Sequence, residues 1–172
     1  MKIGIMGYGE IGKSLHRVYK DFPEYDVRIK ELTWEDNFDG VEVLNVCIPF
    51  FSKDNFVKAV AEAIKKYSPK LTIIHSTVKA GTTQKIIAET GALVVHSPVE
   101  GVHPNIYEGI KSFKKYIGYD NEEAKKLAEE HFSKLGLNYV SYKNSKSTEL
   151  AKLFDTTYYG VCIAWHGEMK KI

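Results

Sequence analysis

The chain has 172 residues, which is enough for one domain with a buried core but not for two large domains. Its formal net charge of +2, with 27% charged residues, excludes the general basic field that nucleic-acid binding needs. Two distant cysteines, no signal peptide before the first strand and no apolar run of about 18 residues predict a soluble cytoplasmic protein with free buried thiols and no membrane contact.

The chain opens with an apolar strand that runs directly into the glycine pattern G-x-G-x-x-G. Ile3 and Ile5 precede this pattern and helical spacing follows it, as a dinucleotide-binding fingerprint requires. Gly7 permits the tight turn, Gly9 leaves the backbone open to a pyrophosphate, and Gly12 lets the helix pack against the strand. The predicted cofactor-binding residues of this turn are Gly7, Tyr8, Gly9, Glu10, Ile11 and Gly12.

A second strand follows the first helix, and its end bears on the choice of cofactor. Val27 and Ile29 alternate with polar residues, which predicts a half-buried strand. A carboxylate at its end would bind the adenosine ribose of NAD, whereas a cation would suit the 2′-phosphate of NADP. Lys30 and Glu31 compete for this position, so NAD and NADP both remain open.

The connection to the third strand is unusually short. Only the polar segment 33–40 separates the second strand from the apolar run 41–49, whereas a crossover between parallel strands needs a dozen or more residues. This spacing predicts an abbreviated Rossmann-like α/β fold, doubly wound around a mainly parallel sheet. A helix capped by Ser52 or Asp54 and a strand at 71–75 are expected next.

Segment 76–83 comes directly after that strand, at the sheet edge where ligands bind in open α/β folds. Its hydroxyl and N–H groups can contact a nicotinamide ring or a substrate. They can equally begin a helix over 84–90, with Thr82 or Thr83 as N-cap. These two interpretations are compatible, and both remain open.

Two histidines and a glutamate lie close together around the next strand, 92–98. Their spacing lacks the helical H-x-x-x-H pattern and no cysteine is near, so no metal site is predicted. His96 is expected to be a strand-end residue with a satisfied hydrogen bond. His103 is the candidate for an imidazole that faces a substrate. The lysine pairs at 65–66 and 114–115 are predicted to be solvated.

The remaining pattern predicts a strand at 116–119, a helix capped by Asp120 or Asn121, a strand at 137–142 and a long last helix. The last helix begins with the cap Ser147-Thr148-Glu149 and would be about 37 Å long. Its second half is apolar nearly all round and must be covered on every side. We therefore expect a dinucleotide-binding domain at 1–146 and a helix at 147–172 that forms a homodimer; the alternative is a groove in its own domain.

Four strings occur along the chain in a recognisable order. They are the fingerprint, the strand end at Ile48-Pro49, Ser76-Thr77-Val78-Lys79-Ala80-Gly81-Thr82-Thr83, and Glu149-Leu150-Ala151-Lys152. Together they resemble the N-terminal NAD-binding domain of the UDP-glucose/GDP-mannose dehydrogenase family. That family lies within a larger set that includes the 6-phosphogluconate and 3-hydroxyisobutyrate dehydrogenases.

The resemblance implies roles for particular residues. Ile48, Pro49, Ser76, Thr77 and Glu100 would lie on the nicotinamide side of NAD or NADP. Lys152 would polarise the oxygen at the reacting carbon, which stabilises charge that develops in the transition state. Thr156 stands where the family has an asparagine.

Three departures limit what the resemblance carries over. The carboxylate Glu100 is displaced by one residue from the family's pattern, and with His96 and His103 its segment partly resembles the prephenate dehydrogenases. The crossover is short, and the family's catalytic cysteine lies in a C-terminal domain without a counterpart here, so Cys162 is not given that role. We expect hydride transfer at an alcohol or carbonyl of a small or sugar-linked anion that Lys152 and Lys79 reach; the alternative is a non-catalytic dinucleotide-binding module or a subunit completed by a separate chain.

Overall fold

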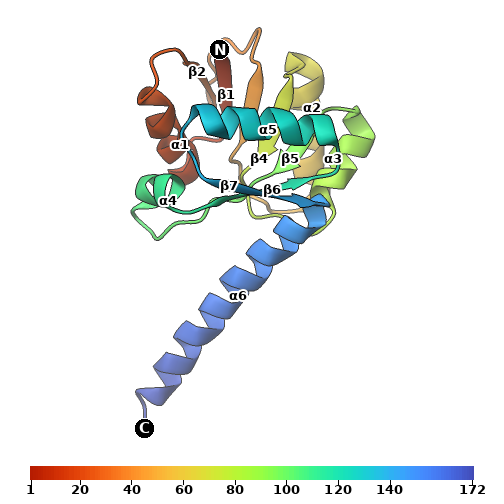
Figure 1. Ribbon diagram of the computed structural model, residues 1–172. Coiled ribbons are helices and arrows are strands. Elements are labelled where there is room, and N and C mark those ends of the chain that lie inside the picture. Colours follow the sequence, from red (N-terminus) through yellow and green to blue (C-terminus); the bar gives the residue numbers. More distant parts are fainter.

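The computed structural model describes residues 1–172 as a seven-stranded sheet between two layers of helices, with one helix projecting from the body (Figure 1). The sheet has the order β2-β1-β3-β4-β5-β6-β7. The strands are β1 (Lys2–Met6), β2 (Asp26–Lys30), β3 (Val43–Val46), β4 (Leu71–Ile74), β5 (Val94–His96), β6 (Lys115–Tyr119) and β7 (Tyr139–Lys143). The helices are α1 (Glu10–Lys20), α2 (Lys53–Tyr67), α3 (Thr82–Thr90), α4 (Ile106–Ser112), α5 (Glu122–Lys134) and α6 (Ser145–Met169).

The sheet is parallel except at one place. Strands β2, β1, β3, β4 and β5 all run in one direction, β6 is antiparallel to β5, and β7 is parallel to β6. Helices cover both faces: Leu15, Ile110 and Phe132 from α1, α4 and α5 belong to one core, and Val60 and Ile86 from α2 and α3 belong to the other. The predicted doubly wound, mainly parallel Rossmann-like fold is confirmed.

The predicted abbreviation lies between β2 and β3, where the chain forms no helix. Phe38 and Val41 from this link are 2% and 3% exposed and fill space beside β1. The fit is close, because a Cβ at Gly4 would lie 2.8 Å from the Phe38 ring. A short link with two inserted side chains thus takes the place of a crossover helix.

Two of the open helix caps are settled by the structure. The Ser52 side chain accepts from the Asn55 N–H at the start of α2, and Asn121 does the same for Glu123 and Ala124 in α5. These are ordinary N-cap contacts, which satisfy N–H groups that have no partner within the helix.

The expected caps of α3 and α6 are wrong. Helix α3 begins at Thr82, and its N-cap is Gly81 at φ 80, a conformation that favours glycine. Helix α6 begins at Ser145, and its N-cap is Asn144. Helix α4 was not expected at all; it is short, and its Gly109 packs directly on Gly101, where a Cβ would lie 2.6 Å from the Gly101 Cα.

Helix α6 leaves the body after its first two turns (Figure 1). The side chains of Tyr158 and Trp165 are 72% and 65% exposed, so the alternative of a groove in its own domain is wrong. No helix in the structure is both long enough and apolar enough to cross a membrane. Cys47 and Cys162 form no disulfide, and each is half-buried rather than buried.

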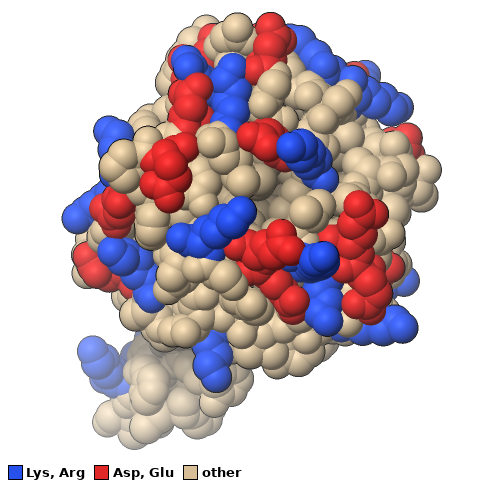
Figure 2. Space-filling model, turned by 45° about the horizontal axis from the view of Figure 1, so that its top comes forward, with Lys and Arg blue, Asp and Glu red and all other residues tan.

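Charges of both signs are interspersed on the face of the body that Figure 2 shows, and the receding helix at the lower left is mostly uncharged. Lys65, Lys66 and Lys114 are exposed, as predicted. Lys115 is an exception, because only 2% of it is exposed. The prediction of a solvated lysine pair at 114–115 is therefore wrong for its second member.

Candidate cofactor site and lysine–glutamate pair

The glycine turn between β1 and α1 has an open backbone. Gly7 adopts φ 95, and its N–H donates to the Lys30 carbonyl at 2.8 Å. A Cβ at Gly12 would lie 2.0 Å from the Gly7 carbonyl oxygen, so only glycine lets α1 approach this closely. A Cβ at Gly9 would meet nothing within 4 Å, which leaves room for a ligand beside the N-terminus of α1.

Glu31 faces this turn, whereas Lys30 does not. The Glu31 carboxylate accepts from the Tyr8 N–H at 2.7 Å and from the Leu32 N–H at 3.0 Å. The Tyr8 N–H is the main cause that lowers the pKa of Glu31 below its usual value. The Lys30 ammonium pairs instead with Glu35. A carboxylate, not a cation, thus stands beside the glycine turn.

The side chains of the other predicted residues of the turn have partners within the protein. The Tyr8 hydroxyl lies 2.6 Å from His16 Nδ1, and the Glu10 carboxylate lies 2.6 Å from His103 Nδ1. Ile11 packs on the core beneath α1. His103, the expected substrate-facing imidazole, is therefore paired with Glu10 at the glycine turn.

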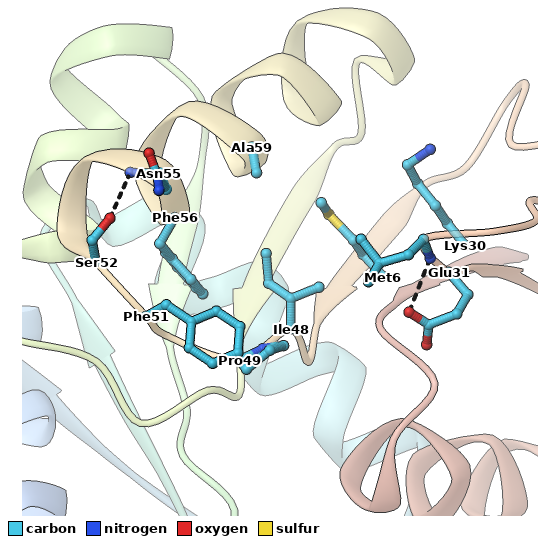
Figure 3. A pocket seen from close by; sticks show the side chains of 11 residues that line it. Met6, Lys30, Glu31, Ile48, Pro49, Phe51, Ser52, Asn55, Phe56 and Ala59 are labelled. Carbon is cyan, nitrogen blue, oxygen red and sulfur yellow. Dashed lines mark hydrogen bonds between the residues drawn. The ribbon is translucent and has the colours of Figure 1, made fainter.

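A cavity of about 440 Å³ opens next to Glu31, between the end of β2 and the start of α2 (Figure 3). Met6 and Ile48 lie between the Glu31 side of the cavity and the α2 side. Phe51 and Leu32, which also line it, are 88% and 98% exposed. Its lining is mostly apolar. The lining residues are Met6, Lys30, Glu31, Leu32, Ile48, Pro49, Phe51, Ser52, Asn55, Phe56 and Ala59.

Ser76 and Thr77 differ in what they offer to a ligand. The Ser76 hydroxyl is buried and donates to the Ile48 carbonyl at 2.6 Å, which ties the end of β4 to the turn at Ile48-Pro49. Thr77 is exposed and has no hydrogen bond from its side chain. Ser76 therefore shapes the wall of the site, and Thr77 is the residue of the two that is open to contact.

The second half of the segment 76–83 binds the last helix. The Glu149 carboxylate accepts from the Gly81 N–H at 2.5 Å, and from the N–H and hydroxyl of Thr83 at 2.8 and 2.7 Å. Glu149 is fully buried, and burial raises its pKa. It supplies the acceptor that α3 lacks at its N-terminus. The segment 76–83 and the segment 149–152 are thus joined by these hydrogen bonds. Neither segment predicts this contact by itself.

One turn after Glu149, the Lys152 ammonium meets Glu100 at 3.0 Å. The two side chains are only 12% and 23% exposed. The displaced carboxylate of the 98–101 segment therefore still reaches the lysine. Thr156 donates its hydroxyl to the carbonyls of Lys152 and Leu153 in its own helix, at 2.9 and 3.1 Å, and so has no proton free for a ligand.

His96 supports the same helix turn. Its Nε2 lies 3.2 Å from the Ser76 carbonyl, which can only accept, so Nε2 carries the proton. Nδ1 lies 2.8 Å from the Thr148 hydroxyl, whose proton it shares with the Ser145 carbonyl at 3.0 Å. Burial lowers the pKa of His96 to about 3, which keeps the ring neutral. The expected satisfied histidine is confirmed, and no three His, Cys, Asp or Glu side chains gather as metal ligands.

The fold and the glycine turn place the chain among proteins with a Rossmann-like α/β domain. Comparison with known proteins narrows this class, although no protein-family model matches the chain. It is 28% identical over 123 residues to UDP-N-acetyl-D-mannosamine dehydrogenase from Methanocaldococcus jannaschii, covering 68% of this chain and 29% of that protein. The enzyme of the same name from Pyrococcus horikoshii is 25% identical over 174 residues, covering 85% and 41%.

Solved structures with a similar fold include dehydrogenases with related names. The UDP-N-acetyl-mannosamine dehydrogenase of Staphylococcus aureus superposes with a TM-score of 0.77 at 15% identity, covering 100% of this chain and 54% of that one. The GDP-mannose dehydrogenase of Pseudomonas aeruginosa superposes with a TM-score of 0.73 at 16% identity, covering 96% and 51%. These likenesses support the predicted resemblance to the N-terminal domain of the UDP-glucose/GDP-mannose dehydrogenase family. The chain spans less than half the length of the curated relatives that it matches.

Proposed function

We propose that the chain is the NAD-binding domain of a dehydrogenase that acts on a sugar nucleotide. The observation that carries this proposal is that the open glycine turn and the half-buried pair of Lys152 and Glu100 lie at the same end of the parallel strands. The relatives named as dehydrogenases of UDP-N-acetyl-mannosamine and GDP-mannose support the substrate class.

The residues of the site fit a dinucleotide. Gly9 leaves space for a diphosphate at the N-terminus of α1, and the cavity beside Glu31 suits an adenosine. Glu31 is positioned to accept from the ribose hydroxyls, whereas Lys30 is held by Glu35. This arrangement favours NAD over NADP, because a 2′-phosphate would meet a carboxylate.

On the nicotinamide side, Lys152 and Glu100 provide the polar groups, and Ser76 and Thr77 flank the turn at Ile48-Pro49. When bound, NAD would supply the hydride acceptor for oxidation of a CH–OH group. The hydroxyl proton would pass to solvent, and the Lys152 ammonium would donate a hydrogen bond to the oxygen and stabilise the negative charge that the loss of this proton leaves in the transition state. Thr156 does not replace the missing asparagine as a donor, because its proton is bonded within α6.

Cofactor binding is tested by titrating NADH and NADPH into the purified chain while recording nicotinamide fluorescence. We expect NADH to bind more tightly than NADPH, and Glu31→Gln to narrow the difference. Gly9→Val should weaken both, since a branched side chain would fill the space beside the turn. Gly160→Val, which lies on the exposed part of α6, is the matched control. If neither cofactor binds, the proposal fails.

Catalysis is tested separately with UDP-N-acetyl-D-mannosamine, by following NADH formation. Lys152→Ala should abolish turnover and leave NADH binding within about threefold, whereas the exposed Lys146→Ala should keep both. Turnover that survives Lys152→Ala would contradict the role of this lysine.

A second candidate is a non-catalytic dinucleotide-binding module, or a subunit completed by a separate chain. The bonded hydroxyl of Thr156 favours it, because the site then has one donor fewer for a substrate oxygen. NADH binding without turnover on any sugar nucleotide would support this candidate.

We also propose that the chain forms a homodimer through α6 in the cytoplasm. The support is the row of exposed apolar side chains along this helix, among them Phe154, Tyr158 and Trp165. Sedimentation equilibrium checks this proposal, and a monomeric mass at high protein concentration contradicts it.

A further inference from the structure

Lys115, the first residue of β6, lies in the interior and has no ion pair. Only 2% of it is exposed. Its ammonium lies 5.9 Å from the centroid of the Phe132 ring, so one side of its site is apolar. Lysine is almost never fully buried without a paired charge, because burial of the ammonium costs solvation energy. The cost of burying this lysine suggests that its side chain has a specific structural or functional role.

Its hydrogen bonds identify what it holds. The Lys115 Nζ donates to the Ser97 carbonyl at 3.2 Å and to the Pro98 carbonyl at 2.9 Å. The Ser97 carbonyl has a second donor, His75 Nδ1 at 2.9 Å, but the Pro98 carbonyl has no other. Lys115 is therefore the contact that fixes the chain at Pro98, two residues before Glu100.

The segment held in this way leads straight to the candidate site. Glu100 crosses from it to Lys152 on α6 at 3.0 Å, so a small shift at Pro98 would separate the two side chains. Glu100 also attracts the buried ammonium, since its charge raises the pKa of Lys115 against the effect of burial.

We propose that Lys115 is a positioning residue for the Lys152–Glu100 pair: its two hydrogen bonds hold the 97–100 segment in the course that brings Glu100 against Lys152. Only the importance of that pair rests on the proposed function. The positioning itself is a property of the folded chain and needs no cofactor.

The ionisation of Lys115 does not alter this geometry. Burial lowers its pKa to about 7, with Lys152 adding to the effect and Glu100 and Cys47 opposing it. Both the ammonium and the neutral amine carry at least two N–H donors, which is the number that the two carbonyls need. The nearby imidazoles of His75 and His96 stay neutral, because burial lowers their pKa values.

The test measures how reactive Lys152 is. The free chain is trace-labelled with acetic anhydride, and the labelling of Lys152 is read by mass spectrometry relative to Lys85. Lys85 pairs with Asp54 at 2.7 Å on the exposed surface, far from Lys115 in the sequence, and serves as the internal reference. Glu100→Gln should raise the Lys152 signal roughly fivefold to tenfold, because it removes a charged hydrogen bond that holds the ammonium.

Two variants of Lys115 then separate its donors from its charge. Lys115→Met has a similar shape without donors, and should raise the Lys152 signal at least about threefold. Lys115→Gln keeps two N–H donors without charge and should stay within about twofold of the wild type. The double variant Glu100→Gln/Lys115→Met should show no further rise over Glu100→Gln, because both changes break one contact.

Thermal unfolding separates positioning from stability. Lys115→Met should unfold at or above the wild-type temperature, since an apolar side chain of similar volume often replaces a buried charge without loss. Unchanged Lys152 labelling in Lys115→Met overturns the proposal. So does a uniform rise at every lysine together with a lower unfolding temperature, which would show a general structural role. Because labelling needs no cofactor, a failure of NADH to bind would count against the proposed function alone.

Discussion

The two halves of α6 belong to one continuous helix but have opposite surroundings. Ser145, Thr148 and Glu149 are at most 3% exposed, and each contacts the body through a polar group. Further along, Phe154 and Trp165 are 67% and 65% exposed, although their side chains are apolar. The polar residues are buried and the apolar ones are exposed, which is the reverse of the usual distribution.

This reversal means that the two halves are held in different ways. The first half is fixed by specific hydrogen bonds and carries Lys152, which meets Glu100 at 3.0 Å. The second half has no contact that would specify a position. Its apolar surface is suited to a partner surface that supplies such contacts.

The largest expected effect is at the first half of α6, which hydrogen bonds anchor to the body and which we call the anchored half; the second half is the exposed half. Glu149→Ala leaves the N–H groups of Gly81 and Thr83 without their acceptor in the interior, and we expect a loss of about 3–5 kcal/mol in the free energy of unfolding. Urea unfolding followed by circular dichroism measures it. Glu168→Ala is the matched control on the exposed half, where Glu168 pairs only with Lys171, and it should change stability by less than about 0.5 kcal/mol. Equal losses of stability in Glu149→Ala and Glu168→Ala would contradict the difference between the two halves of α6.

Two glycines offer a second comparison. At Gly118, under the anchored half, a Cβ would lie 2.1 Å from the Thr148 hydroxyl oxygen and 3.0 Å from the Ser145 Cα. Gly118→Ala should therefore cost about 2–3 kcal/mol. At Gly160, within the exposed half, a Cβ would meet nothing within 4 Å, so Gly160→Ala should stabilise the helix by up to about 1 kcal/mol. Unfolding curves of the two variants should shift in opposite directions; a shift in the same direction would count against the packing described.

The pH dependence of stability extends the comparison to the buried cation near the anchored half. The pKa of Lys115 is about 7 in the folded chain and higher when unfolded, so between these values the unfolded chain binds the extra proton. The free energy of unfolding should therefore rise with pH above about 7, by up to about 1.4 kcal/mol per pH unit from this group, and be flat below it. Lys115→Met should remove this contribution. A wild type and variant with parallel curves from pH 7 to 9 would show that Lys115 is not buried as described.

The smallest effect on stability is expected at the exposed half. Tyr158→Ser combined with Trp165→Ser should change the free energy of unfolding of the monomer by less than about 0.5 kcal/mol, because neither side chain packs on the body. The same pair of changes should weaken self-association, which sedimentation velocity over a range of concentrations detects. A loss of stability as large as that of Glu149→Ala would mean that this half is anchored too.

Local patterns in the sequence predict the parts of this protein that local forces make. The glycine turn, the strand alternation and the caps at Ser52 and Asn121 follow from residues within a few positions of one another. The short link after β2 is also visible from spacing alone. Helix α4 escaped prediction because it is short, and its place is set by contact between Gly101 and Gly109.

The parts of the candidate site that were missed depend on distant residues. Glu149 meets residues 66 and 68 positions away, so its role as the cap of α3 leaves no local signal. Lys115 follows another lysine and has the pattern of a solvated pair, yet its side chain is enclosed by segments from elsewhere in the chain. The choice between Lys30 and Glu31 is different, because Glu35, which pairs with the lysine, lies only five residues after it. Tertiary contacts decided the positions of Glu149 and Lys115.

The antiparallel course of β6 has a consequence for where functional residues can arise. In a wholly parallel sheet, one rim collects only the residues that follow each strand. Because β6 runs against β5, this rim also receives the residue that opens β6, which is Lys115, opposite the segment that leaves β5. Because of this single reversal, both residues that follow a strand and residues that begin a strand can lie at this end of the sheet.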